Sequence, residues 1–181
     1  MPESPDHFAL LGLPRSYLLN RQQLEAQYEK LTLEHHPDFF ATAGAEAQRN
    51  AEETSARINR AYKTLLSDLA RADYLLELYH AGRERDTRAL PGGFLQEMFL
   101  LQEEVDELGE DASPEQRAPL RAQCLERLKT VKQQRATLFG EAEGHAADPA
   151  TGNGTPPEDL LAELQANLNS ERYLQRLLDR L

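Results

Sequence analysis

Pro37 is the residue that most constrains how this chain can fold. It stands between two stretches, 24–35 and 51–65, in which apolar residues recur at helical spacing. A proline disfavours the helical conformation of the residue before it and has no backbone N–H, so the first helix must end there. His36 precedes this corner and Asp38 follows it. The sequence therefore predicts a polar tripeptide at the tip of a hairpin of two helices.

The rest of the composition predicts helices and no sheet. Hydrophobic residues make up 40% of the 181 positions, and aromatic residues only 7%. Leu, Ala, Glu, Gln and Arg, which are strong helix formers, dominate the chain. No run of alternating apolar and polar residues is flanked by turn residues. We therefore expect an all-α fold.

The charge and the single cysteine exclude several classes of protein. The net charge is −11, with 20 basic residues against 31 acidic ones. A nucleic-acid partner requires clustered Lys and Arg, so none is expected. No apolar run approaches the roughly 20 residues that span a bilayer, and the first residues match no signal or transit peptide. Cys124 cannot form an internal disulfide and falls on an apolar helical stripe, where we expect an inert core thiol. These features predict a cytoplasmic protein without a membrane partner.

Caps and spacing place the helices of the first half. Asp6 caps a short apolar turn that ends at Leu11, and Asn20 caps the helix that ends at the corner. A loop is expected over Phe39–Ala45. Two further helices are expected at about Glu46–Leu66 and Asp68–His80.

The second half follows a break in periodicity. Residues 81–93 contain Gly and Pro and predict a linker between a domain at 1–80 and one at 94–181. Three amphipathic helices are expected, at about Phe94–Gly109, Ser113–Phe139 and Glu158–Leu181. Residues 140–157 are rich in Gly, Ala and Pro, and predict a mobile loop. The second domain is thus expected to be a three-helix bundle.

These motifs resemble a known family. His36-Pro37-Asp38 between two helices is similar to the J-domain signature. Ile58-Asn59-Arg60-Ala61-Tyr62-Lys63-Thr64-Leu65, Arg71-Ala72-Asp73-Tyr74-Leu75-Leu76, and Phe94-Leu95 with Glu103-Glu104-Val105-Asp106 resemble the HscB type. The resemblance implies a J-domain at 1–80, and a co-chaperone of iron–sulfur cluster assembly that is neither an enzyme nor a cofactor carrier. Its implied partners are a DnaK-class ATPase chaperone of the HscA type and a cluster scaffold protein of the IscU type.

The resemblance also implies two binding sites. His36, Pro37 and Asp38 would contact the chaperone ATPase. The scaffold would bind Leu95, Gln96, Phe99, Leu100, Glu103 and Tyr173. A second apolar face on the same helix carries Phe94, Met98, Leu101 and Val105, and a helix that is apolar on both faces should expose one of them.

The chain departs from the family at both sites. Phe39 stands where a basic residue usually follows the tripeptide. The helix before it carries Arg21 and Lys30 against three glutamates, which predicts weak electrostatic steering toward an acidic partner. Gln96 replaces a common methionine, and Leu100 replaces a common acid.

Three alternative functions stay open. The chain could serve a general DnaK-class chaperone with other clients, or be a structural helical protein whose corner is incidental. His35, His36 and Asp38 could also be ligands of a metal-dependent enzyme, although adjacent histidines at a helix end are poorly placed to share one ion.

Overall fold

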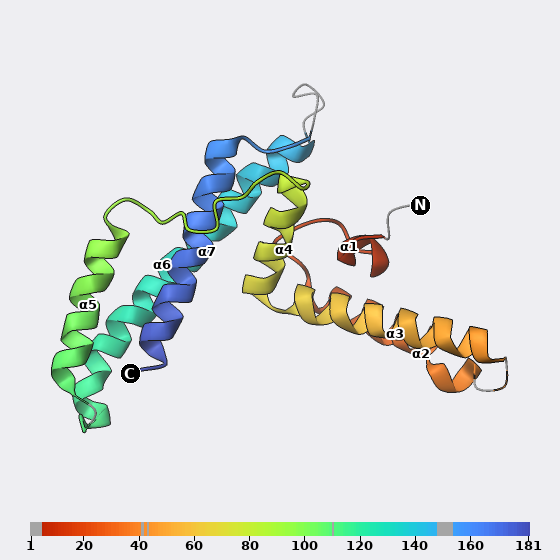
Figure 1. The fold of residues 1–181 in the computed structure, drawn as a ribbon, viewed down its shortest axis with the longest axis horizontal. Coiled ribbons are helices and arrows are strands. Elements are labelled where there is room, and N and C mark those ends of the chain that lie inside the picture. The colour runs from red at the N-terminus through yellow and green to blue at the C-terminus, as the bar shows by residue number, and fades with distance from the viewer. Residues whose placement is uncertain (1–4, 41, 43, 110, 148–153) are drawn as a thin grey trace. The chain divides into compact units, whose positions relative to one another are not determined.

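The chain folds into two compact units of helices, 1–75 and 76–181, and the division falls within one helix. The computed structural model describes residues 5–40, 42, 44–109, 111–147 and 154–181. No strand occurs in these ranges, so the predicted all-α fold is confirmed. Figure 1 shows the helices in chain order.

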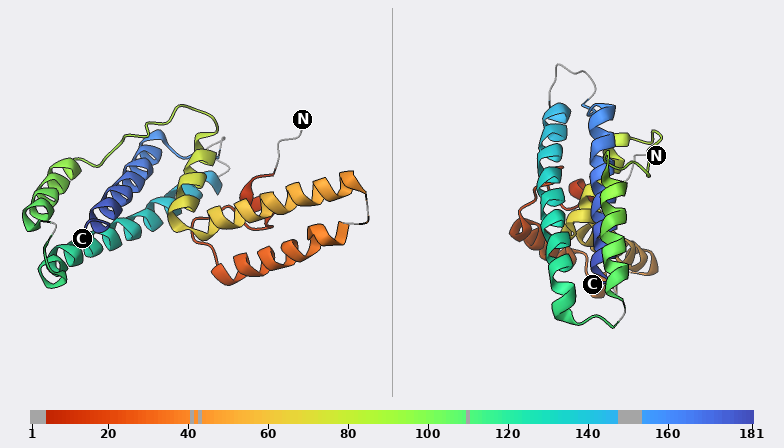
Figure 2. Two further views of the ribbon diagram at one scale, coloured as in Figure 1. Left: turned by 60° about the horizontal axis from the view of Figure 1, so that its bottom comes forward. Right: turned by 90° about the vertical axis from the view of Figure 1, so that its left-hand side faces the viewer.

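The first unit is built on a helical hairpin. α2 (Arg21–Glu34) and α3 (Ala45–Leu66) run antiparallel, and the short α1 (His7–Leu10) packs against α3 (Figures 1 and 2). Asp6 and Asn20 cap α1 and α2, as predicted, by accepting the backbone N–H of Ala9 and Gln23. The core of the unit includes residues of α1 to α4 and of the segment after α1: Phe8, Leu11, Leu13, Leu24, Ala51, Ile58, Ala61, Leu65 and Ala72.

Two tyrosines and an asparagine hold the hairpin together. The Tyr28 hydroxyl on α2 donates to Asn59 Oδ1 on α3 at 2.7 Å. The Tyr28 and Tyr62 rings stack with their centroids 4.0 Å apart. Because the stacked rings and the partly buried hydrogen bond both require one register, α2 cannot slide along α3 without losing them. The position of the corner at the end of α2 is therefore fixed relative to α3.

α4 (Asp68–His80) begins in the first unit, where its motif residues have structural roles. The buried Arg71 guanidinium donates to the carbonyls of Tyr17 and Leu65, at 2.8 and 2.5 Å. The Tyr74 hydroxyl accepts the N–H of His7 at 3.0 Å. The Arg-Ala-Asp-Tyr-Leu-Leu block thus ties the N-terminal segment to α4.

The second unit contains α5 (Phe94–Leu108), α6 (Pro114–Ala147) and α7 (Glu158–Leu178). Consecutive helices run antiparallel, and each packs against the other two, with the most extensive packing between α6 and α7 (Figures 1 and 2). The core shared by the three helices contains Phe94, Met98, Leu101, Val105, Leu120, Cys124, Val131, Leu174 and Leu177. The predicted three-helix bundle is confirmed.

Three predicted boundaries were wrong. The loop at Phe39–Ala45 begins instead with a single 3₁₀ turn, Pro37–Phe40, that packs against α3. The final helix ends at Leu178. α6 continues to Ala147, so the first eight residues of the predicted mobile loop are helical. Phe139 and Ala142 are fully buried there, and this burial offsets the helix cost of two glycines. The part of that loop at 148–153 lies outside the described residues.

Candidate functional site

The His36-Pro37-Asp38 corner lies at the end of α2 and its polar side chains are exposed. His35 is the C-cap of α2, and its N–H donates to the Leu31 carbonyl at 3.0 Å. Pro37 begins the 3₁₀ turn, in which the Phe39 N–H donates to the His36 carbonyl at 3.1 Å. The side chains of His36 and Asp38 are 47% and 87% exposed, so a partner protein can reach both.

The corner also orients its imidazole. The backbone N–H of Asp38 donates to His36 Nδ1 at 3.3 Å, and a carboxylate oxygen of Asp38 lies 3.7 Å from the same nitrogen. Because Nδ1 accepts a hydrogen bond, the neutral ring carries its hydrogen on Nε2. The corner therefore offers an N–H donor and a carboxylate acceptor side by side.

An exposed donor and an exposed acceptor at the corner are suited to hydrogen bonding with polar groups of a partner protein. The sequence leaves His35, His36 and Asp38 open as metal ligands. In the described parts of the chain, no three His, Cys, Asp or Glu side chains lie together in a way that could hold a metal ion.

α5 presents the second candidate surface. Its Phe94, Met98, Leu101 and Val105 face is buried in the bundle core. The opposite face leaves Leu95, Phe99 and Leu100 each 59–60% exposed, with Gln96 and Glu103 exposed beside them. Leu95, Gln96, Phe99 and Leu100 line a shallow hollow of about 370 Å³. One of the two apolar faces is thus exposed, as predicted, and we call these four residues with Glu103 the α5 patch.

Tyr173 differs from the other predicted scaffold-binding residues. It lies on α7, is only partly exposed, and packs edge-on against Phe94 with ring centroids 6.0 Å apart. Its ring is therefore partly a core group, and only its remaining surface is open to a partner.

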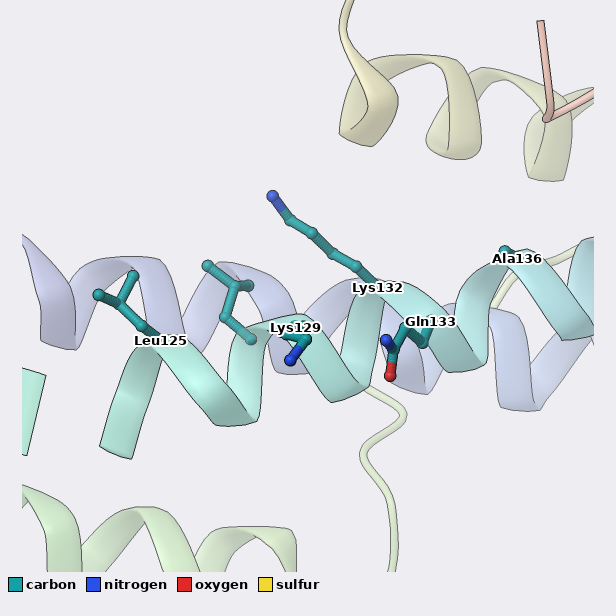
Figure 3. A pocket seen from close by; sticks show the side chains of 6 residues that line it. Leu125, Lys129, Lys132, Gln133 and Ala136 are labelled. Atoms are coloured by element: carbon teal, nitrogen blue, oxygen red, sulfur yellow. The ribbon is translucent and has the colours of Figure 1, made fainter. Parts of the chain in front are cut away.

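The structure contains a further apolar hollow that the sequence did not predict. It measures about 470 Å³ and lies along α6, lined by Leu125, Leu128, Lys129, Lys132, Gln133 and Ala136 (Figure 3). Leu125 is exposed there. Both lysines already pair with carboxylates: Lys129 with Glu126, and Lys132, at 3.7 Å, with Glu171. The only signal in the sequence is an extra leucine next to the core stripe of α6, which does not distinguish this hollow from ordinary surface.

Comparisons with known proteins agree with the fold. The model of the DnaJ domain family matches residues 6–74. The co-chaperone protein HscB homolog of Bordetella petrii is 35% identical over 145 residues, which cover 78% of this chain and 83% of that protein. The co-chaperone protein HscB of Proteus mirabilis is 32% identical over 128 residues, which cover 70% of this chain and 74% of that protein.

Solved structures show the same architecture. The chaperone HscB from Vibrio cholerae superposes with a TM-score of 0.66 and 28% identity, covering 97% of this chain and 98% of that one. The crystal structure of human co-chaperone protein HscB gives a TM-score of 0.76 over 99% of this chain and 81% of that one. Its sequence is 24% identical, so this similarity is evidence for the fold only. With a J-domain corner, a helical bundle and these relatives, the chain belongs to the HscB family of J-domain co-chaperones.

Proposed function

We propose that this protein stimulates the ATPase of a DnaK-class, HscA-type chaperone and delivers an IscU-type scaffold protein to it during iron–sulfur cluster assembly. The observation that carries the proposal is the exposed corner, where His36 and Asp38 are oriented by one hydrogen bond on a braced hairpin. A donor and an acceptor on a rigid tip can favour one conformation of an ATPase if they bind that conformation more tightly. The corner then acts by binding one conformation of the ATPase more tightly than the other, and the partner chaperone hydrolyses the ATP.

The α5 patch is the proposed scaffold site. Its apolar centre of Leu95, Phe99 and Leu100 is rimmed by Glu103, and Tyr173 completes the set of proposed contacts from α7. Exposed apolar clusters with a polar rim are typical of protein–protein contacts. Cargo and ATPase would thus meet different surfaces of the co-chaperone, which is what a delivery role requires.

The test of the corner measures steady-state ATP hydrolysis by the HscA-type chaperone, with and without scaffold. His36→Gln should abolish the stimulation and leave scaffold binding intact. His35→Gln, the same change one residue earlier, is the matched control and should keep the stimulation. Stimulation by His36→Gln equal to that of the unchanged protein would refute the corner's role.

The test of the patch is a binding titration with the scaffold. Leu95→Ala with Phe99→Ala should weaken binding, while the melting temperature hardly changes because both side chains are largely exposed. Leu125→Ala, an exposed leucine in the α6 hollow, is the control. If scaffold adds nothing to the stimulation, and a general DnaK-class chaperone is stimulated as well as the HscA type, the general co-chaperone function is favoured instead.

A further inference from the structure

Two exposed apolar side chains flank the polar corner. Leu33, one helical turn before His36, is 66% exposed, and Phe39, directly after the tripeptide, is 64% exposed. The Phe39 ring meets the His36 ring edge-on, with centroids 5.9 Å apart and planes at 63°. The imidazole that the proposed function relies on therefore adjoins an exposed benzyl group.

The helix that leads to the corner offers little positive charge. α2 carries two cations and three carboxylates, a balance of −1. Arg21 Nε lies 2.9 Å from Glu25, and Lys30 Nζ lies 4.0 Å from Glu34, so each cation has a carboxylate one turn away. Such pairs reduce the field that a partner meets, and little long-range attraction toward an acidic surface remains.

We infer that Phe39, supported by Leu33, replaces charge with apolar contact as the source of affinity for the DnaK-class chaperone. The inference rests on the proposed function and names the chemistry of that same contact. The partner surface facing Phe39 must then be apolar, and binding should respond little to salt, because apolar burial is not screened by ions. Phe39 would also select between chaperones that differ in charge at this point.

The affinity lost on truncating Phe39 can be bounded. Burying a phenylalanine side chain in an interface corresponds to roughly a ten- to hundredfold change in affinity. Because the side chain is exposed in the free protein, its removal should not affect folding.

The experiment titrates full-length co-chaperone into the ATPase assay at low and at high ionic strength. Phe39→Ala should raise the concentration for half-maximal stimulation about tenfold or more, and nearly keep the maximal rate. Leu18→Ala, which truncates another exposed apolar side chain before α2, is the control and should change neither value. Phe39→Leu should retain most of the affinity, and the half-maximal concentration of the unchanged protein should be nearly the same at both ionic strengths.

The outcomes separate the two proposals. If Phe39→Ala lowers the maximal rate and leaves the half-maximal concentration unchanged, the ring only positions His36, and the inference is overturned. A steep loss of affinity with salt in the unchanged protein would also overturn it, since charge would then supply the contact. In both cases stimulation by the unchanged protein leaves the proposed function standing. If that protein gives no stimulation at all, the proposed function fails and the inference fails with it.

Discussion

The buried Arg135–Glu171 pair allows a sharp test of what holds α6 and α7 together. The Arg135 side chain is fully buried and that of Glu171 is 2% exposed. Arg135 Nη2 donates to one Glu171 oxygen, and Gln175 Nε2 donates to the other at 2.9 Å. Arg135 Nε also donates to Asn167 Oδ1 at 3.0 Å, and Asn167 in turn donates to the Val131 carbonyl. The pair is thus the centre of a polar network inside the bundle.

Glu171→Gln removes the charge and almost nothing of the volume. It leaves the Arg135 guanidinium buried without a counter-charge, which costs about 3–5 kcal/mol in comparable cases. That free energy corresponds to a roughly hundred- to several-thousandfold increase in the equilibrium constant for local unfolding of α7. Arg135→Met combined with Glu171→Leu should destabilise α7 far less than the two single changes together, by about 1–3 kcal/mol. The double variant leaves no buried charge, and only Asn167 Oδ1 and the partly buried Gln175 Nε2 lose a hydrogen-bond partner described above.

Hydrogen–deuterium exchange on peptides of α7 is the suitable assay, because it reports on this helix and not on the other unit. Lys132→Met is the matched control, because it removes an exposed cation near the same carboxylate. It should destabilise α7 by at most about 1 kcal/mol. Unchanged exchange in Glu171→Gln would refute the reasoning. So would a double variant that is as unstable as the sum of the single ones.

Three further predictions concern single groups. Burial and the charges of Arg85 and Arg83 lower the pKa of His80 below 6.5, so the unfolded state binds the proton more readily. The second unit should therefore lose stability as the pH falls through 6.5, and His80→Gln should flatten this part of a plot of denaturation midpoint against pH. Arg71→Met should destabilise the first unit by about 1–3 kcal/mol for each carbonyl it leaves unpaired, measured as urea denaturation. Asn20→Ala should cost about 1 kcal/mol in the same assay, while Asn20→Gly should cost only a few tenths.

The features that the sequence predicted well are those set by neighbouring residues. Asn20 caps a helix through an N–H three positions along, and Pro37 ends that helix through contacts with the residue before it. The two faces of α5 follow from helical spacing alone, since positions 94 and 98 must share one face and positions 95 and 99 must share another. The location of the corner and the exposure of the α5 patch follow from the same local rules.

The features that the sequence missed depend on partners far along the chain. Asn167 and Glu171 are polar residues between the leucines of α7, and spacing assigns them no partner. They are buried because Arg135, 32 and 36 residues earlier, reaches both of them. The length of α6 was missed because the burial of Phe139 and Ala142 outweighs the two glycines nearby. At the corner, the bond from the Asp38 N–H to His36 Nδ1 depends on the 3₁₀ turn, which no local residue pattern indicated.

Cys124, the chain's single cysteine, has a practical consequence for all of these measurements. Its side chain is fully buried, and burial together with the charge of Glu104 raises the pKa of the thiol. Little thiolate is present at neutral pH, and reagents cannot reach it in the folded protein. A cysteine introduced on the surface, for example at Gln96 or Leu125, would therefore be the one fast-reacting thiol. Fluorescent dyes or spin labels could then be attached at a chosen place without first removing the native residue.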